Sequence, residues 1–309
     1  IDEVSDKPYK SQNKNVMHAC GHDAHVAVLL GVCKVLNNFK DKFGGVVKAV
    51  FQPGEETSGG ALPMIEEGVL ENPHTDVCVA LHCDSDLDCG TIRVKPGSLY
   101  ASPDDFRITV KGKGGHGAEP HNCIDPIMIS ASIIQALNNL ISRETDPFDN
   151  AVISVGSIHG GSATNIIPDS VEIQGTARSL TNEVRGFLKK RIGETAEGIC
   201  KTFGAECEYE YTELFPPLIN DEKLAEDVYD SACRSIGKDK CVWGGAPTMA
   251  GEDFSYFSQN RPSVLFKLGC RNKSLGIVSL IHHSSFDIDE NCLKTGVKVF
   301  VGFVLDYLN

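Results

Sequence analysis

The chain has 309 residues, of which 41% are hydrophobic and 23% charged, a balance typical of globular proteins. This length exceeds that of one ordinary core and predicts two domains. The net charge is −13, from 29 Lys and Arg against 42 Asp and Glu, and the basic residues are scattered. Nucleic acids and anionic membranes are therefore not expected as partners, because both attract basic surfaces.

Twelve cysteines occur without paired short spacings, and a CxxC zinc knuckle is absent. Cys33 and Cys78 lie within apolar runs, where a free thiol behaves as a small hydrophobic side chain. No secretory segment opens the chain, and no apolar run is long enough to cross a bilayer. These features predict a reducing compartment, the cytoplasm.

In chain order, apolar residues first recur at helical spacing over residues 22–39, and the first turn of this predicted helix carries a cluster of His and Asp. Short apolar strands are predicted at 46–51, before Gln-Pro-Gly-Glu-Glu, and at 76–81, before His82. Ligands bind at the carboxyl ends of the strands in open α/β sheets. We therefore expect these polar groups to converge with the start of the helix.

From about residue 99 the pattern changes to that of a compact α+β domain. Strands are predicted at 106–110, 151–157, 170–177 and 206–211, and helices at 125–141 and 183–203. After residue 213 helices at 221–236 and 291–308 and a strand at 263–268 resume the α/β pattern. The sequence thus predicts an α/β fold in which residues 1–98 and 213–309 form one discontinuous domain and residues 99–212 form an inserted second domain.

The strongest chemical signal is the segment His18-Ala-Cys-Gly-His-Asp-Ala-His25. The thiolate of Cys20 and the imidazole of His22, two residues apart, can bind a metal ion together. Two other interpretations stay open at this point. The segment could be a polar helix start whose histidines bond to the backbone, or Cys20 could be the nucleophile of a thiol hydrolase with His22 as its base.

Glu55 and Glu56 lie on a loop after a predicted strand, where adjacent side chains diverge. One can bind a metal while the other acts as a general base. His82 at a strand end and the pair His282-His283 supply further potential ligands. A lone histidine is more often structural than catalytic, so each of these residues gains weight only from the others.

Residues 112–117 match the GxGxxG pattern of dinucleotide-binding proteins. We reject that function, because Pro120 and Pro126 interrupt the required helix and no acidic residue follows at the required spacing. His116 is better interpreted as an imidazole that a glycine-rich hairpin presents to a ligand. Asn165 and Arg178, taken alone, are more simply a turn residue and a surface arginine.

Seven segments together resemble the M20 metallopeptidase family. They are His18-Ala-Cys-Gly-His-Asp-Ala-His25, Phe51-Gln-Pro-Gly-Glu-Glu56, Leu81-His82, Gly114-Gly-His-Gly-Ala-Glu-Pro-His121, Asn165-Ile-Ile-Pro-Asp169, Gly251-Glu-Asp-Phe254 and Ile281-His-His-Ser-Ser-Phe286. The subgroup that the chain resembles contains N-acyl-L-amino-acid amidohydrolases, hippurate hydrolases and indole-acetyl-amino-acid hydrolases. The resemblance runs in order from the first residue to the last.

The resemblance implies a zinc-peptidase-like catalytic domain with an inserted ferredoxin-like lid that mediates homodimerisation. It also implies two divalent ions, drawn from Mn, Zn, Co and Ni. Cys20 would bridge them, and His22, Glu56, His82 and His282 would be the remaining ligands. His282 is preferred to His283 because it keeps the family's four-residue offset to Phe286.

The same resemblance implies the roles of the other site residues. Glu55 would be the general base that activates water and passes its proton to the leaving amine. His116 and Asn165 would face the developing oxyanion, with His116 able to reach the site of a second subunit. Arg178 would pair with the carboxylate of a small N-acyl amino acid, whose amide bond is cleaved to a carboxylic acid and a free amino acid.

One departure from the family keeps an alternative open. Residues 1–9 resemble a stretch that follows further helices and strands in the family, including a strand that carries an Asp near the metals. The 309 residues would then lack those elements. A non-catalytic member of the family that binds a metal or a partner is therefore the alternative to the enzyme.

Overall fold

The structure is a computed structural model that describes residues 1–57 and 59–309. The chain forms two compact units. The first unit comprises Ile1–Gly97, Asn220–Ala246 and Phe257–Asn309, and the second comprises Ser98–Ile219 and Pro247–Tyr256. The two units are groups of residues that contact one another. The predicted domains rest instead on sequence pattern and resemblance. The boundaries 1–98, 99–212 and 213–309 therefore stay a prediction.

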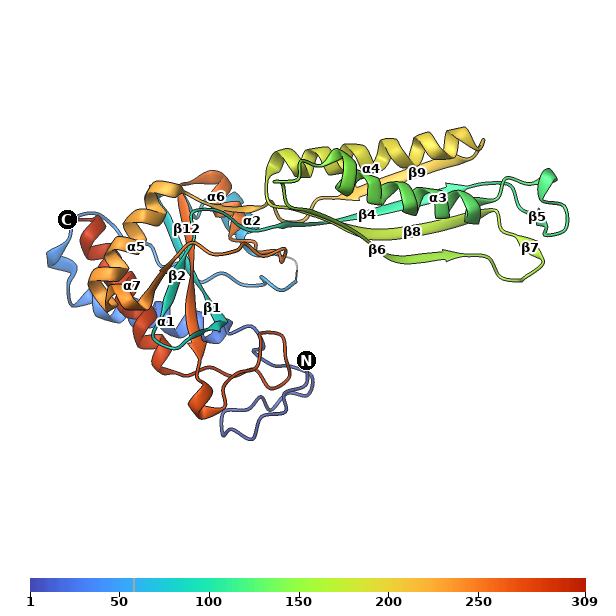
Figure 1. The fold of residues 1–309 in the computed structure, drawn as a ribbon. Helices are drawn as coiled ribbons and strands as arrows, with labels where there is room; N and C mark the ends of the chain where they lie inside the picture. Colours follow the sequence, from blue (N-terminus) through green and yellow to red (C-terminus); the bar gives the residue numbers. More distant parts are fainter. Residues whose placement is uncertain (58) are drawn as a thin grey trace. The chain divides into compact units, whose positions relative to one another are not determined.

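The first unit is built on a four-stranded sheet (Figure 1). Its strands, in spatial order, are β1 (Cys78–Asp88), β12 (Ser263–Arg271), β2 (Ile92–Val94) and β11 (Cys241–Trp243). β1 and β12 run parallel, and β2 pairs with β12 in the antiparallel direction. This mixed arrangement with packed helices confirms the predicted α/β class.

Three helices pack against this sheet, namely α1 (His22–Asn37), α5 (Glu222–Ile236) and α7 (Asn291–Tyr307). α7 contacts both α1 and α5, so the three helices form one layer. Their apolar residues join those of the strands in a single core that includes Val28, Phe266 and Val299. The helix predicted at 22–39 is confirmed to within two residues, but its buried face carries Ala24, Val28, Val32 and Leu36, whereas Val26 and Leu30 are exposed.

The second unit has the order strand, helix, strand, strand, helix, strand, as Figure 1 shows. Its elements are β4 (Ser102–Lys111), α3 (Pro126–Asn139), β6 (Ala151–Gly160), β8 (Ser170–Ser179), α4 (Asn182–Thr202) and β9 (Glu206–Thr212). The antiparallel sheet has the spatial order β6-β8-β4-β9, and α3 and α4 cover one of its faces. This is the ferredoxin-like topology that the resemblance implies.

The local sequence explains where these two helices begin. The carboxylate of Asp125 accepts hydrogen bonds from the backbone of Ile127 and Met128 at the start of α3. The hydroxyl of Thr181 accepts one from Val184 at the start of α4. Such caps satisfy backbone N–H groups that have no partner within the helix.

The remaining elements are short. They are η1 (Lys40–Lys42), α2 (Ala61–Glu66), β3 (Gly97–Tyr100), β5 (Gly115–His116), η2 (Pro120–Asn122), η3 (Leu140–Glu144), β7 (Ile166–Ile167), β10 (Leu218–Asn220), η4 (Lys238–Lys240), α6 (Ser255–Asn260) and η5 (Lys273–Leu275). β5 pairs with β7, and β3 pairs with β10. Within the described residues, no helix combines the length and the apolar character needed to cross a membrane.

Two sequence predictions of strands need correction. Residues 46–51 form no strand within the described chain, because a strand needs a pairing partner and this segment pairs with none of the described strands. Val46 and Phe51 are exposed there. The strand predicted to end before His82 continues to Asp88, because its parallel pairing with β12 continues, so His82 lies within β1.

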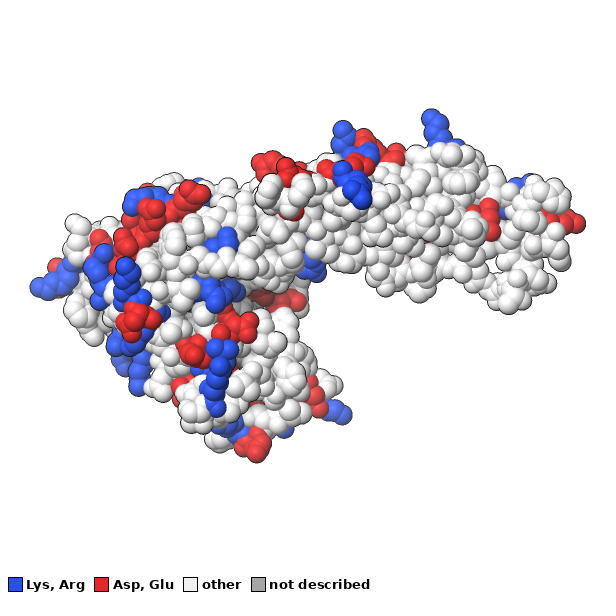
Figure 2. All heavy atoms as spheres, in the orientation of Figure 1, with Lys and Arg blue, Asp and Glu red and all other residues white. Residues whose placement is uncertain are grey.

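Charged side chains of both signs are interspersed over the face drawn in Figure 2. Ion pairs between surface side chains include Arg191 with Glu144 at 2.7 Å and Arg234 with Asp306 at 2.8 Å. Such exposed pairs contribute little to stability.

Candidate metal centre

Cys20 and His22 stand on either side of a glycine at the start of α1. Gly21 is the N-cap residue and has a φ of 80°, a left-handed conformation that favours glycine. A Cβ atom at Gly21 would lie 3.2 Å from the Cβ and Sγ atoms of Cys83, so the backbone passes close to β1. This tight turn places the buried Cys20 and the first residue of the helix beside the strand that carries His82.

Six side chains from four separate segments of the first unit come together. They are Cys20, His22, Glu55, Glu56, His82 and His282. The potential ligand atoms of Cys20, His22 and His82 lie within 4.8 Å of one another, and so do those of Cys20, Glu56 and His282. Cys20 belongs to both groups. The five residues expected as metal ligands therefore lie close together, and the Cys20 thiol shared by both groups would suit a site for two ions.

Several potential ligand atoms lie 3.2 to 3.8 Å from one another. Cys20 Sγ lies 3.5 Å from His82 Nε2. His282 Nε2 lies 3.2 Å from Glu56 Oε1. His22 Nε2 lies 3.8 Å from a carboxylate oxygen of Glu55 and 3.8 Å from one of Glu56.

Burial favours the neutral, metal-binding form of two histidines of this cluster, His22 and His82. Burial lowers the pKa of His82 well below that of a free imidazole, and the charge of Lys267 adds to this effect. Burial also lowers the pKa of His22, against the opposing attraction of Glu56. His82 Nδ1 lies 2.7 Å from the carbonyl oxygen of Cys83 and donates to it. That bond leaves the lone pair of Nε2 directed toward Cys20.

His25 supports the cluster from behind. Its Nε2 atom accepts a hydrogen bond of 2.9 Å from the backbone N–H of Cys83, which follows the candidate ligand His82. Its ring centroid lies 4.8 Å from that of His82. Burial, with smaller effects of His22 and Lys267, lowers the pKa of His25 to about 3. His25 is therefore a neutral acceptor that fixes the backbone beside His82.

Glu55 and Glu56 follow the extended segment 46–51, which a lysine anchors. Lys48 Nζ donates to the carbonyl oxygens of Val69, Glu71 and Pro73 at 2.6, 2.8 and 2.9 Å. The sequence analysis missed this role of Lys48, for which a single charge within an apolar run is the only signal. The Glu55 side chain is 22% exposed and that of Glu56 is 46% exposed.

The two adjacent histidines of the C-terminal loop have different surroundings. His282 belongs to the group with Cys20 and Glu56. His283 Nδ1 is instead 2.7 Å from the hydroxyl of Ser285, which also contacts Ser279 at 2.8 Å. His283 is thus engaged within its own loop, which favours His282 as the ligand.

The donor set fits divalent transition metals. A thiolate and imidazoles suit zinc, cobalt and nickel, and carboxylates suit manganese and other hard ions. The ligand atoms come from one thiol, three imidazoles and a carboxylate, and a second carboxylate lies beside them. This chemistry fits two ions with a neighbouring base better than it fits an isolated structural zinc site, which has a closed set of four ligands.

His116, Asn165 and Arg178 all lie in the second unit. His116 in β5 pairs with Ile166 in β7, and Gly117 N donates to the carbonyl oxygen of Asn165 at 2.8 Å. A Cβ atom at Gly117 would lie only 3.1 Å from the backbone of Asn165. The glycines of the GxGxxG pattern therefore serve a close approach of two chain segments, which brings His116 and Asn165 together.

The tautomer of His116 follows from its backbone contact. Its Nδ1 atom accepts a hydrogen bond of 3.1 Å from Ala118 N. A neutral imidazole that accepts at Nδ1 carries its proton on Nε2. His116 therefore presents an exposed N–H donor, the group that a developing oxyanion needs.

Arg178 lies on β8 and is half-buried. Its Nη1 atom donates to the carbonyl oxygen of Met249 at 2.7 Å. This contact ties the segment around residues 247–256 to the sheet of the second unit. Arg178 is thus a structural contact as well as a candidate ligand for a carboxylate.

A cluster of thiol, imidazole and carboxylate ligands around a shared cysteine, on an α/β unit, defines a metal-dependent hydrolase. The model of peptidase family M20/M25/M40 matches residues 1–306. The chain belongs to this family.

Two relatives of this chain are named as hydrolases. A thermostable carboxypeptidase 2 of Saccharolobus solfataricus is 39% identical over 312 residues, which cover 100% of this chain and 78% of the relative. An N-acetyl-L-cysteine deacetylase of Bacillus subtilis is 38% identical and covers 95% of this chain and 68% of its own length. Both fit the family to which the chain belongs.

A solved structure agrees with these relatives. A Bacillus subtilis protein described as a dinuclear metal binding peptidase of the M20 family superposes with a TM-score of 0.86 at 31% identity. The match covers 100% of this chain and 78% of that one. The fold implied by the resemblance is therefore confirmed.

Proposed function

We propose that this protein is a metal-dependent amidohydrolase that cleaves the amide bond of small N-acyl amino acids. The products are a carboxylic acid and a free amino acid. The observation that carries this proposal is the assembly of Cys20, His22, Glu56, His82 and His282 around one shared thiol, with Glu55 beside them. The relatives named as a deacetylase and a carboxypeptidase support the substrate class, because both names denote hydrolysis at an amide.

Two divalent ions, with Mn, Zn, Co and Ni as candidates, would be held by these five ligands and would polarise the amide carbonyl while making water more acidic. Glu55 is the proposed general base. Its carboxylate is partly exposed and lies next to His22 without being part of either group around Cys20. It takes a proton from the attacking water and delivers it to the leaving amine.

His116 and Asn165 are proposed to stabilise the oxyanion of the tetrahedral intermediate. The support is the Nε2–H tautomer of His116 and the close backbone contact that holds the two residues together. Preorganised donors of this kind lower the barrier because they need no reorientation as charge develops. In a homodimer formed through the second unit, His116 could serve the site of a second subunit.

Arg178 is proposed to bind the substrate carboxylate. A guanidinium offers a planar fork of donors that matches a carboxylate. The Met249 carbonyl engages Nη1 and so fixes the orientation of the guanidinium plane. We further propose a cytoplasmic protein, since a reducing compartment keeps the Cys20 thiol available for metal binding.

The test is removal and return of the metal. Chelator-treated protein should be inactive toward acetyl, benzoyl and indole-acetyl amino acids, and activity should return with at least one of Mn, Zn, Co or Ni. No activity with any of these metals would contradict the proposal. Inactivation by thiol alkylation in a protein that resists chelators would favour a hydrolase that uses Cys20 as its nucleophile instead.

A further inference from the structure

We propose that Asn272 and Asp289 form a clamp that positions His282 for metal binding, an inference that rests on the proposed metal centre. Asn272 directly follows β12, and Asp289 precedes α7. The segment between them, residues 273–288, carries His282. Because these two residues lie at the ends of the segment, the bond between them closes it into a loop.

His282 needs such help because its own side chain is poorly packed. The imidazole is 55% exposed, so contacts with neighbouring side chains do little to fix it. Its backbone has a φ of 63°, an unusual conformation for a residue other than glycine. A residue keeps such a conformation only when the surrounding structure imposes it. The position of the ligand is therefore set by the backbone of the loop.

Contacts at two places hold the loop that carries His282, in addition to backbone bonds within the loop such as Phe286 N to the carbonyl oxygen of His283 at 2.9 Å. At the far part of the loop, His282 N donates to the carbonyl oxygen of Ala19 at 2.7 Å, next to Cys20. At the base, Asn272 Nδ2 donates to Asp289 Oδ2 at 2.6 Å. The first contact joins the loop to the other ligands, and the second fixes its two ends relative to the sheet and to α7.

Asp289 is well suited to this role. It is 7% exposed, and its Oδ1 atom accepts hydrogen bonds of 3.0 and 2.9 Å from the backbone and side-chain nitrogens of Asn291. Its backbone N–H donates to the carbonyl oxygen of Cys270 at 2.9 Å. These bonds from Asn272 and Asn291 lower the pKa of the Asp289 carboxyl. Asp289 thus joins both ends of the loop to β12 and α7.

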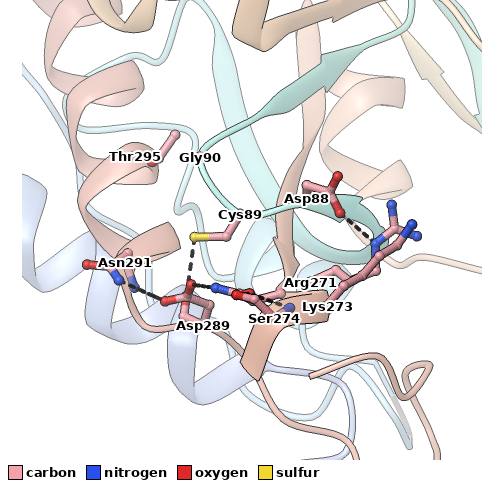
Figure 3. Close-up of a pocket in the computed structure, with 10 residues that line it drawn as sticks. Asp88, Cys89, Gly90, Arg271, Lys273, Ser274, Asp289, Asn291 and Thr295 are labelled. Atoms are coloured by element: carbon pink, nitrogen blue, oxygen red, sulfur yellow. Dashed lines mark hydrogen bonds and ion pairs between the residues drawn. The ribbon is translucent and has the colours of Figure 1, made fainter. Parts of the chain in front are cut away.

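A pocket lies beside the clamp, as Figure 3 shows. It has a volume of about 520 Å³, and its walls include Asp88, Arg271, Lys273 and Thr295. Side chains that border open space lack packing partners on that side. On this side the loop is held by hydrogen bonds and not by close packing. Loss of the Asn272–Asp289 bond should therefore make the loop more mobile.

The test exchanges the two polar partners. In Asn272→Asp, one oxygen can still accept from Ser274 and Leu275, as Asn272 Oδ1 does now, but a carboxylate replaces the donor that faces Asp289. The metal-free protein is titrated with Co²⁺ and followed by calorimetry and by visible absorption, which reports on the ligands. Wild type should bind two ions, and Asn272→Asp should bind one of them about tenfold more weakly, with an altered spectrum.

The double variant Asn272→Asp with Asp289→Asn supplies the rescue. It restores a donor and an acceptor in reversed order, since Asp289 Oδ2 faces Asn272 while Oδ1 faces Asn291. Binding of the second ion should return toward wild type. The matched control is Asp88→Asn, which removes an exposed carboxylate that borders the same pocket and pairs with Arg271. This control should bind both ions as wild type does.

The outcomes are distinguishable. If wild type binds no Co²⁺, the proposed metal centre fails. If wild type binds two ions and Asn272→Asp binds both with unchanged affinity and spectrum, or if the double variant shows no rescue, the clamp is contradicted. Should Asn272→Asp fail to fold, Asn272→Ser replaces it, because the shorter side chain keeps an oxygen that can accept from Ser274 N and loses the amide N–H that donates to Asp289.

Discussion

Cys20 is the residue on which the proposed chemistry depends most. It belongs to both groups of potential ligands, whereas His82 and His282 each belong to one. Its sulfur is buried and lies 3.5 Å from His82 Nε2. A metal ion would keep such a thiol deprotonated near neutral pH. Both ions would therefore depend on a single side chain at a glycine turn.

His25 makes the stability of the metal-free protein depend on pH. Its pKa is about 3 in the folded chain against 6.5 for a free imidazole. The unfolded chain binds more protons between these values, so the free energy of unfolding falls as the pH is lowered from 6.5 toward 3. The lowered pKa values of His22 and His82 act in the same direction.

We therefore expect urea unfolding in the presence of a chelator to give a lower stability near pH 5 than near pH 7. Part of this difference should disappear in His25→Gln, which cannot gain a proton. His74→Gln is a suitable control, because this histidine is exposed and its Nδ1 atom contacts the exposed Glu71. A pH dependence that is the same in His25→Gln and in wild type would contradict the role given to His25.

Cys20 with His22, and Glu55 with Glu56, could be predicted as candidates because their spacing is local, whereas His82 and His282 entered the ligand set through the resemblance to the family. Cys20 and His22 share one turn, and Glu55 and Glu56 are adjacent in the sequence. The support given by His25 and the tautomer of His116 could not be predicted in detail. Each depends on a hydrogen bond to the backbone, at Cys83 N for His25 and at Ala118 N for His116, and a residue pattern does not encode bond geometry.

At the scale of elements, the helices were predicted more closely than the strands. α5 and α7 agree with the predicted ranges to within one residue, because apolar periodicity and caps are local signals. The segment 46–51 has the composition of a strand but none of the described strands pairs with it. Strand formation depends on partners far along the chain, which composition alone cannot reveal.

A buried ion pair holds the elements of the second unit together. Asp104 on β4 is fully buried and accepts hydrogen bonds of 2.7 Å from both Nε and Nη2 of Arg185 on α4. It also accepts bonds from Tyr211 Oη at 2.9 Å and from Leu214 N at 3.0 Å. One carboxylate thus links a strand, a helix and the segment that follows β9.

Removal of this carboxylate should be costly. Asp104→Ala leaves the half-buried Arg185 without its partner, and we expect a loss of about 3–5 kcal/mol in the free energy of unfolding. Denaturant unfolding of the purified variant measures this loss. Asp105→Ala is the matched control, since this neighbouring carboxylate is exposed on the same strand. Equal stabilities of the two variants would contradict the importance of the buried pair.

At the scale of the whole molecule, the proposed ligands all lie in the first unit, whereas the proposed oxyanion and carboxylate partners lie in the second. Metal binding should therefore stabilise the first unit directly. At a free metal concentration about 100 times Kd, the gain is about 2.7 kcal/mol. Scanning calorimetry should show a transition that moves to higher temperature with metal, and a thermogram unchanged by metal would contradict this placement.

The division of labour between the two adjacent glutamates gives the most direct test of the proposed function. Glu56, which lies near Cys20 and His282, is the proposed ligand, and Glu55, which lies near His22, is the proposed base. The measurement is the metal content and the kcat/KM of Glu55→Gln and Glu56→Gln toward an N-acyl amino acid that wild type cleaves.

We predict that Glu55→Gln keeps the metal content of wild type and loses about 10²- to 10⁴-fold in kcat/KM, the usual contribution of a general base. Glu56→Gln should instead lose metal. A Glu55→Gln variant that retains its metal and cleaves the substrate as fast as wild type would contradict the proposed mechanism.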